Sequence, residues 1–78
     1  MEKTIYSDDY RRLCRMLKAR RVFLGLRQAE LADRLSASQT FVSNYEKGER
    51  RLDLIELDRI CAALDLSLVE FVTEFKGG

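Results

Sequence analysis

One short pattern, repeated three times, restricts this chain to helical structure. An apolar residue precedes a cap position, and a Glu three residues after the cap is followed by a second apolar residue. The copies are Leu26–Leu31, Leu52–Leu57 and Leu66–Phe71. In such a capping box the Glu accepts a hydrogen bond from a free backbone N–H, and the two apolar residues clamp the entry turn. Two copies have proper cap residues, Asp53 and Ser67, whereas Arg27 is not one. The pattern predicts helices that begin near residues 28, 54 and 68.

Two further helices follow from apolar spacing and from the glycines. Apolar residues recur at helical spacing over residues 8–23, where Ser7 can cap the start and Gly25 can close the end in a left-handed turn. Ser38 marks another start, which Gly48 stops. The chain has no proline, and no segment alternates as a strand does. We therefore expect one all-α domain, a compact five-helix bundle preceded by a flexible arm at residues 1–7. The expected helices are 8–23, 28–35, 39–46, 54–64 and 68–75.

The composition excludes several classes of protein. The 78 residues are 46% hydrophobic and 35% charged, which is typical of a soluble globular domain. No apolar run approaches the roughly 20 residues of a membrane span. The N-terminus lacks the basic-then-apolar order of a signal peptide, so we expect a cytoplasmic protein.

The residue types in the sequence give little support for metal binding or catalysis. The chain has no histidine, the commonest metal ligand and general base. Cys14 and Cys61 stand among apolar neighbours at helical spacing, so both are interpreted as small buried thiols. There is no Gly-rich phosphate loop and no evident carboxylate pair in a cleft. We expect a protein that is not an enzyme and uses no metal or cofactor.

The charges are distributed unevenly. Residues 11–51 hold eleven Lys and Arg against four acidic residues, a net charge of +7, while the rest of the chain carries −6. A near-neutral total therefore does not argue against a polyanionic partner.

The basic part contains two short helices with a distinctive division of side chains. Ala32 is small where the second helix must cross the first, and Val42 and Tyr45 face inward. The outer face of the second helix carries four uncharged hydrogen-bonding side chains, Gln39, Thr40, Ser43 and Asn44.

The segment "QAELADRLSASQTFVSNYEKGERR" resembles the helix-turn-helix of the XRE family, the Cro/C1-type class of phage repressors. The matching positions are Gln28, Ala32, Val42, Glu46 and Gly48, and the resemblance extends over about residues 8–75. It implies a lambda-repressor-like DNA-binding domain, with the helix-turn-helix at residues 28–46. The implied function is a sequence-specific transcriptional regulator, a repressor or controller, bound as a homodimer to a palindromic operator in double-stranded DNA.

The resemblance also implies roles for individual residues. Base contacts fall on Gln39, Thr40, Ser43 and Asn44, and on Phe41 unless its ring packs into the core. Phosphate contacts fall on Gln28, Ser38, Lys47 and Arg50, with the neighbouring Arg27 and Arg51. Arg21 and Glu46 match a buried or half-buried ion pair that joins the first helix to the recognition helix. Ser36 stands where the family has glycine in a left-handed turn, so it is strained by roughly 1 kcal/mol or the turn is altered.

The last helix offers a dimer interface. We expect the segment 67–75 to pair through Leu68, Val69, Val72 and Phe75. A stripe facing the core would account for Leu68, Phe71, Val72 and Phe75 but not for Val69, and the alternative is that this helix only closes the core of a monomer.

A second function class stays open. The same fold can serve as a protein-interaction module, an antitoxin or an adaptor, with the apolar last helix as its contact. The base-facing quartet and the basic segment favour DNA binding. Neither a membrane partner nor a small-molecule effector is evident.

Overall fold

The computed structural model describes residues 7–77, which form five helices and, within that range, no strand. The helices are α1 (Asp8–Phe23), α2 (Gln28–Leu35), α3 (Gln39–Glu46), α4 (Leu54–Ala63) and α5 (Leu68–Gly77). The all-α fold is confirmed, and the first three helices have the predicted bounds. The fourth helix ends one residue earlier than predicted, and the fifth continues two residues further. Apart from Ser7, the arm expected at residues 1–7 lies outside the described residues.

The capping boxes form at the predicted helix starts. At α4 the Glu56 carboxylate accepts from the Asp53 backbone N–H at 3.0 Å, and the Asp53 carboxylate accepts from the Glu56 N–H at 2.7 Å. Ser67 and Glu70 make the same exchange at α5, with both distances 3.0 Å. At α2 only half of the box exists, because Glu30 accepts from the Arg27 N–H at 2.8 Å but a guanidinium has no acceptor to offer in return.

The turns combine expected glycines with two strained residues. Gly25 has φ +75°, the left-handed turn that was predicted after α1, and Gly48, predicted only as the stop of α3, has φ +79°. Ser36 takes the same conformation, with φ +54° and ψ +42°, so the turn between α2 and α3 keeps its shape at the cost of strain in a residue with a Cβ. Asp65, after α4, has φ +59° and was not anticipated.

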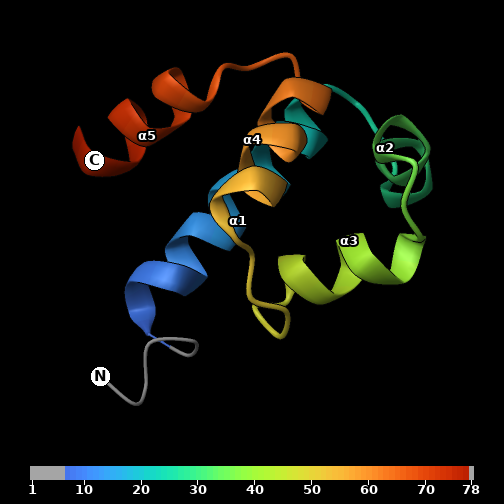
Figure 1. Cartoon of the computed structure of the whole chain (residues 1–78), viewed down its shortest axis with the longest axis horizontal. Helices are drawn as coiled ribbons and strands as arrows, with labels where there is room; N and C mark the ends of the chain where they lie inside the picture. Colours follow the sequence, from blue (N-terminus) through green and yellow to red (C-terminus); the bar gives the residue numbers. More distant parts are fainter. Residues whose placement is uncertain (1–6, 78) are drawn as a thin grey trace.

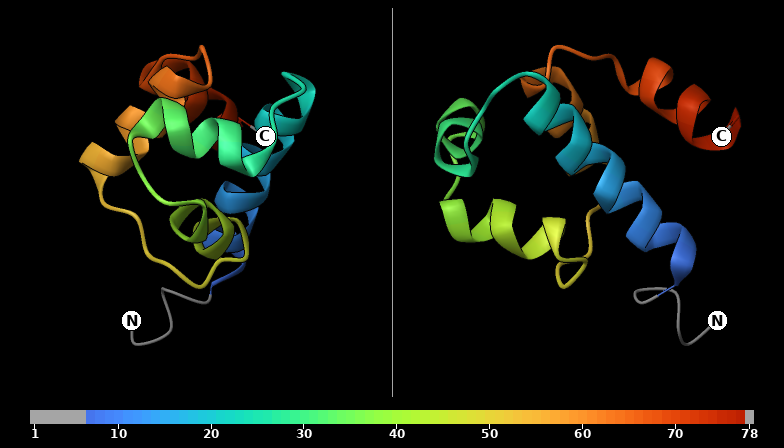
Figure 2. Two further views of the ribbon diagram at one scale, coloured as in Figure 1. Left: turned by 90° about the vertical axis from the view of Figure 1, so that its right-hand side faces the viewer. Right: turned by 180° about the vertical axis from the view of Figure 1, so that it is seen from behind.

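The core draws side chains from all five helices. The largest fully buried side chains are Tyr45, Phe71, Leu17, Leu31, Ile60, Leu64 and Val42. Cys14 and Cys61 are buried free thiols, as predicted. In the views of Figures 1 and 2, α2 and α3 lie toward one end of the molecule and α5 toward the other, with α1 and α4 between them. Helix α3 is fixed to the body by the buried Val42 and Tyr45, whereas Gln39 and Thr40 on its outer side are exposed.

The last helix divides its apolar residues between two faces. Phe71 is buried, whereas Val69 is 74% exposed and Val72 is 40% exposed. Of the stripe that would face the core, Phe71 is buried and Leu68 and Phe75 are half-buried, whereas Val72 lies about 40° from Leu68 at the exposed edge of the stripe. None of the helices in residues 7–77 is long and apolar enough to span a membrane.

Candidate nucleic-acid interface

Helix α3 is held on the body by its inner face. Val42 and Tyr45 have no exposed surface, and the Phe41 and Tyr45 rings meet edge to face with centroids 5.5 Å apart. The Ser38 hydroxyl caps the helix by accepting from the Phe41 N–H at 3.1 Å. Full burial of two large side chains on an eight-residue helix fixes its rotation about its own axis.

The opposite face of α3 carries the predicted quartet together. Gln39, Thr40, Ser43 and Asn44, with Lys47 after the helix, line one open hollow of about 340 Å³. Gln39 and Thr40 are exposed, and Ser43 and Asn44 are half-buried. Amide and hydroxyl groups on one face of a protruding helix match the edges of bases in a duplex major groove, where Gln and Asn pair with adenine and a Thr methyl meets thymine.

A hydrogen-bonded chain connects this face to the interior. Gln39 Nε2 donates to Gln28 Oε1 at 3.3 Å, and Gln28 Nε2 donates to Glu46 Oε1 at 2.9 Å. Glu46 in turn receives Arg21 Nε at 2.7 Å and Arg21 Nη2 at 3.0 Å. Arg21 also donates to the Leu26 carbonyl at 2.7 Å, which ties the turn before α2 to the same pair.

The Arg21–Glu46 pair is buried, with side-chain exposures of 10% and 3%. Its hydrogen bonds raise the pKa of Arg21 further above its ordinary value, so the guanidinium stays charged. The pair joins α1 to the C-terminal turn of α3, which is the connection that the family resemblance implies. Gln28, expected at a phosphate, is half-buried and spends one amide hydrogen on Glu46, which leaves the other for an external acceptor.

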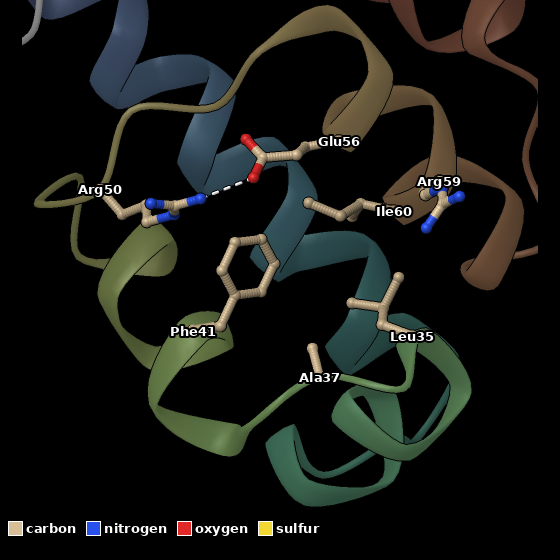
Figure 3. Close-up of a pocket in the computed structure, with 7 residues that line it drawn as sticks. All are labelled: Leu35, Ala37, Phe41, Arg50, Glu56, Arg59 and Ile60. Atoms are coloured by element: carbon tan, nitrogen blue, oxygen red, sulfur yellow. Dashed lines mark hydrogen bonds and ion pairs between the residues drawn. The ribbon is translucent and has the colours of Figure 1, made fainter.

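Phe41 lies apart from the quartet. It is half-buried and lines a separate hollow of about 270 Å³ between α3 and α4, together with Leu35 and Ile60 (Figure 3). Of the two interpretations open at the sequence level, this placement favours packing on the core. Arg50 lies over the Phe41 ring, 5.0 Å from its centroid, and pairs with Glu56 at 2.6 Å.

The remaining residues expected at phosphates are all at the surface. Arg27, Ser38, Lys47, Arg50 and Arg51 are exposed. Arg27 lies 3.4 Å from Glu30, and the Arg51 guanidinium lies 6.0 Å from the centre of the Tyr10 ring. The Nη2 group of Arg50 is engaged by Glu56, which competes with any phosphate that this arginine binds.

Four arginines of the basic segment have structural partners instead. Arg21 is one, as described above. Arg20 donates to the Leu64 and Asp65 carbonyls at the end of α4, and Arg34 donates to the Ala63 carbonyl there. Arg12 donates to the Phe75 carbonyl and stacks on its ring, 4.1 Å from the centroid, which attaches α5 to α1.

Sequence reasoning missed the role of Tyr10. Its hydroxyl donates to the Arg50 carbonyl and accepts from the Leu52 N–H at 3.0 Å, so it holds the loop between α3 and α4 on both sides of Arg51. In the helical pattern of residues 8–23, Tyr10 was interpreted only as an apolar residue. No local pattern reveals a contact between residues about forty positions apart.

The same helix-turn-helix arrangement occurs in known proteins. A family model described as helix-turn-helix matches residues 17–71. No curated protein sequence matches the chain. Among solved structures, an XRE-family like protein from Pseudomonas syringae pv. tomato str. DC3000 is 36% identical, with a TM-score of 0.88 over 97% of this chain and 93% of that chain.

Two other solved structures are regulators. The restriction-modification controller protein C.Esp1396I, solved as a tetramer with its natural 35 base-pair operator, is 25% identical, with a TM-score of 0.84 over 91% of this chain and 93% of that one. The clp gene regulator ClgR from C. glutamicum is 26% identical, with a TM-score of 0.76 over 88% of this chain and 87% of that one.

Proposed function

The chain belongs to the XRE family of helix-turn-helix proteins, and from this we propose that it is a DNA-binding transcription regulator that acts without catalysis. In finer detail, it binds a palindromic operator as a homodimer, with α3 in the major groove, and acts in the cytoplasm as a repressor or controller. A solved structural neighbour, the controller C.Esp1396I, is bound to its operator, which supports the DNA partner.

The single observation that carries the proposal is the outer face of α3. Four amide and hydroxyl side chains stand together on a helix whose inner face is fully buried, so the backbone that carries them is held in a fixed orientation. Preorganised groups lose little freedom when they bind, and this favours discrimination between base pairs. The carboxylate of the helix, Glu46, is withdrawn into the ion pair with Arg21 and therefore does not repel a duplex.

Base reading and backbone binding are separable by mutation. Asn44→Ala is expected to relax preference at one base pair by about 1–3 kcal/mol. Lys47→Ala is expected to weaken all sequences alike and to lower the slope of log K against log salt by about 1. The operator is first found by in-vitro selection of bound duplexes, and both variants are then titrated by fluorescence anisotropy. Equal losses on all sequences for both variants would refute the division of roles.

Dimerisation rests on the exposed face of α5. Val69 and Val72 are neighbouring apolar side chains at the surface, one helical turn apart. One helix-turn-helix unit reads few base pairs, and symmetric operators match proteins with two-fold symmetry. A pair of α5 helices would bury both valines, with Leu68 and Phe75 at the edge, and leave α3 free.

The dimer is tested by sedimentation equilibrium of Val69→Asp/Val72→Asp, which is expected to be a monomer with operator affinity reduced at least tenfold. Val22→Asp, at a 58% exposed position on α1, serves as the control for placing a charge on an exposed valine. If the double variant stays dimeric, the interface lies elsewhere. If α3 variants keep biological activity while α5 variants lose a protein partner, the chain is an interaction module instead.

A further inference from the structure

A second hollow lies beside the recognition face, between the first half of α1 and the end of α3. It measures about 110 Å³ and is lined by Arg11, Cys14, Arg15, Glu46, Lys47 and Gly48. Three of these six residues are cations with exposed side chains. Two of the three, Arg11 and Arg15, belong to α1, outside the helix-turn-helix itself.

The hollow is electropositive because its acidic member is already neutralised. Glu46 gives its carboxylate to Arg21 and Gln28 inside the fold. Burial raises the pKa of the Cys14 thiol, which keeps that group uncharged. Within residues 7–77, neither Arg11, Arg15 nor Lys47 forms an ion pair.

The fold gives no structural reason for this arrangement. Arg11 and Arg15 are four residues apart on one helix face, where like charges repel and destabilise the helix. This contrasts with Arg12, Arg20, Arg21 and Arg34, each of which bonds to a carbonyl or a carboxylate of the domain. Arginines that cost stability and form neither an ion pair nor a side-chain hydrogen bond within residues 7–77 indicate an external anion.

The position of the hollow indicates which anion. Lys47 lines both this hollow and the hollow beside Gln39, Thr40, Ser43 and Asn44, so the two are neighbours on the surface. Gly48 lies beside α1, since a Cβ added there would be in ordinary van der Waals contact with the Arg11 side chain, at 3.8 Å. A sugar-phosphate backbone that passes the end of α3 at Lys47 therefore meets Arg15 and Arg11 next.

We infer that Arg11 and Arg15, together with Lys47, form an additional phosphodiester-binding site that extends contact with the duplex backbone beyond the helix-turn-helix. The inference rests on the proposed function, because the phosphates it takes belong to the same bound duplex. The two arginines add affinity without sequence preference, since phosphate contacts carry no base information.

The test compares charge-removing variants in salt titrations. Each phosphate contact contributes about 0.9 to the slope of log K against log salt, so Arg11→Gln and Arg15→Gln should each lower it by about 0.9 and the double variant by about 1.8. Loss of affinity should be equal on selected and scrambled duplexes. Arg59→Gln, on α4 at the separate hollow near Phe41, removes the same charge and should leave the slope unchanged.

Folding is monitored in parallel by thermal unfolding. Because the substitutions relieve like-charge repulsion, the midpoints of Arg11→Gln and Arg15→Gln should equal or exceed that of the wild type. Unchanged slopes in a wild type that binds its selected operator would overturn the inference and leave the proposed function intact. A wild type that binds no duplex at any salt concentration would overturn both.

Discussion

The buried ion pair provides the sharpest test of how this domain holds its recognition helix. Glu46→Gln keeps the shape of the side chain but removes the negative charge that faces Arg21. Arg21 is only 8% exposed, and it donates two hydrogen bonds to Glu46 and one to the Leu26 carbonyl. The substitution affects the two hydrogen bonds to Glu46 and leaves the one to Leu26 in place. Removing one partner of a buried pair costs about 3–5 kcal/mol, because the other charge stays desolvated.

That loss is large for a chain of this length. Domains gain about 0.05–0.15 kcal/mol per residue, which for 78 residues is about 4–12 kcal/mol in total. At about 4–8 °C per kcal/mol, Glu46→Gln should lower the melting temperature by roughly 12–40 °C. Urea unfolding followed by circular dichroism measures the free energy, and a thermal scan measures the midpoint.

The matched control removes both charges. Arg21→Met/Glu46→Leu replaces the pair by apolar side chains of similar size, a change that is often neutral or stabilising. We expect this double variant to be at least about 2 kcal/mol more stable than Glu46→Gln. A cost below about 1 kcal/mol for Glu46→Gln would show that water reaches the pair, and the account of a desolvated connection between α1 and α3 would be wrong.

Two other predictions concern local features. Ser36→Gly should raise the free energy of unfolding by about 0.5–1 kcal/mol in urea titrations, because glycine relieves the strain at φ +54° and unfolded-state entropy offsets only part of that gain. Ser36→Ala should not raise the free energy of unfolding. Equal effects of the two substitutions would contradict the strain at this residue. The stability that Cys61 and Tyr10 contribute should be complete below pH 9 and fall toward pH 12, because burial raises the pKa of Cys61 from 9.0 to about 11 and that of Tyr10 from 10.0 to about 12. The unfolded chain therefore releases these protons first, and Tyr10→Phe should flatten the loss between pH 10 and pH 12 in urea midpoints recorded against pH.

Local chemistry explains why so much of the fold was predictable. Capping boxes, cap serines and glycine stops act within four residues, so the sequence alone located every helix start and the ends of α1, α2 and α3. The end of α4 was less visible because its stop is Asp65 in a left-handed turn, a role that glycine usually signals. Helical spacing groups Val72 with Leu68, Phe71 and Phe75, but spacing alone does not show that Val72 lies at the exposed edge of that stripe.

The sequence was sufficient to predict which side chains of the candidate site lie at the surface, but not which residues hold them in place. Helical period sufficed to place the four polar side chains of α3 on one face, opposite Val42 and Tyr45. The partners of Tyr10 and Arg50 depend on how the loop between α3 and α4 returns across α1, which no periodicity encodes. Gln28 shows the same limit, since its bond to Glu46 spans eighteen positions and exists only when α2 and α3 are docked.

The contact between Arg50 and Glu56 has a functional consequence. One of its oxygens caps α4 through the Asp53 N–H, and the other holds Arg50 over the Phe41 ring. An exposed pair of this kind contributes about 0–1 kcal/mol, whereas a charge-assisted bond from arginine to phosphate is stronger, so a duplex can take Arg50 at little cost. Glu56→Gln keeps the cap and frees Arg50, and it should tighten binding to all duplexes by up to about fivefold. Glu70→Gln, the same substitution in the capping box of α5, should not, and equal gains for both would mean that net charge rather than this pair controls affinity.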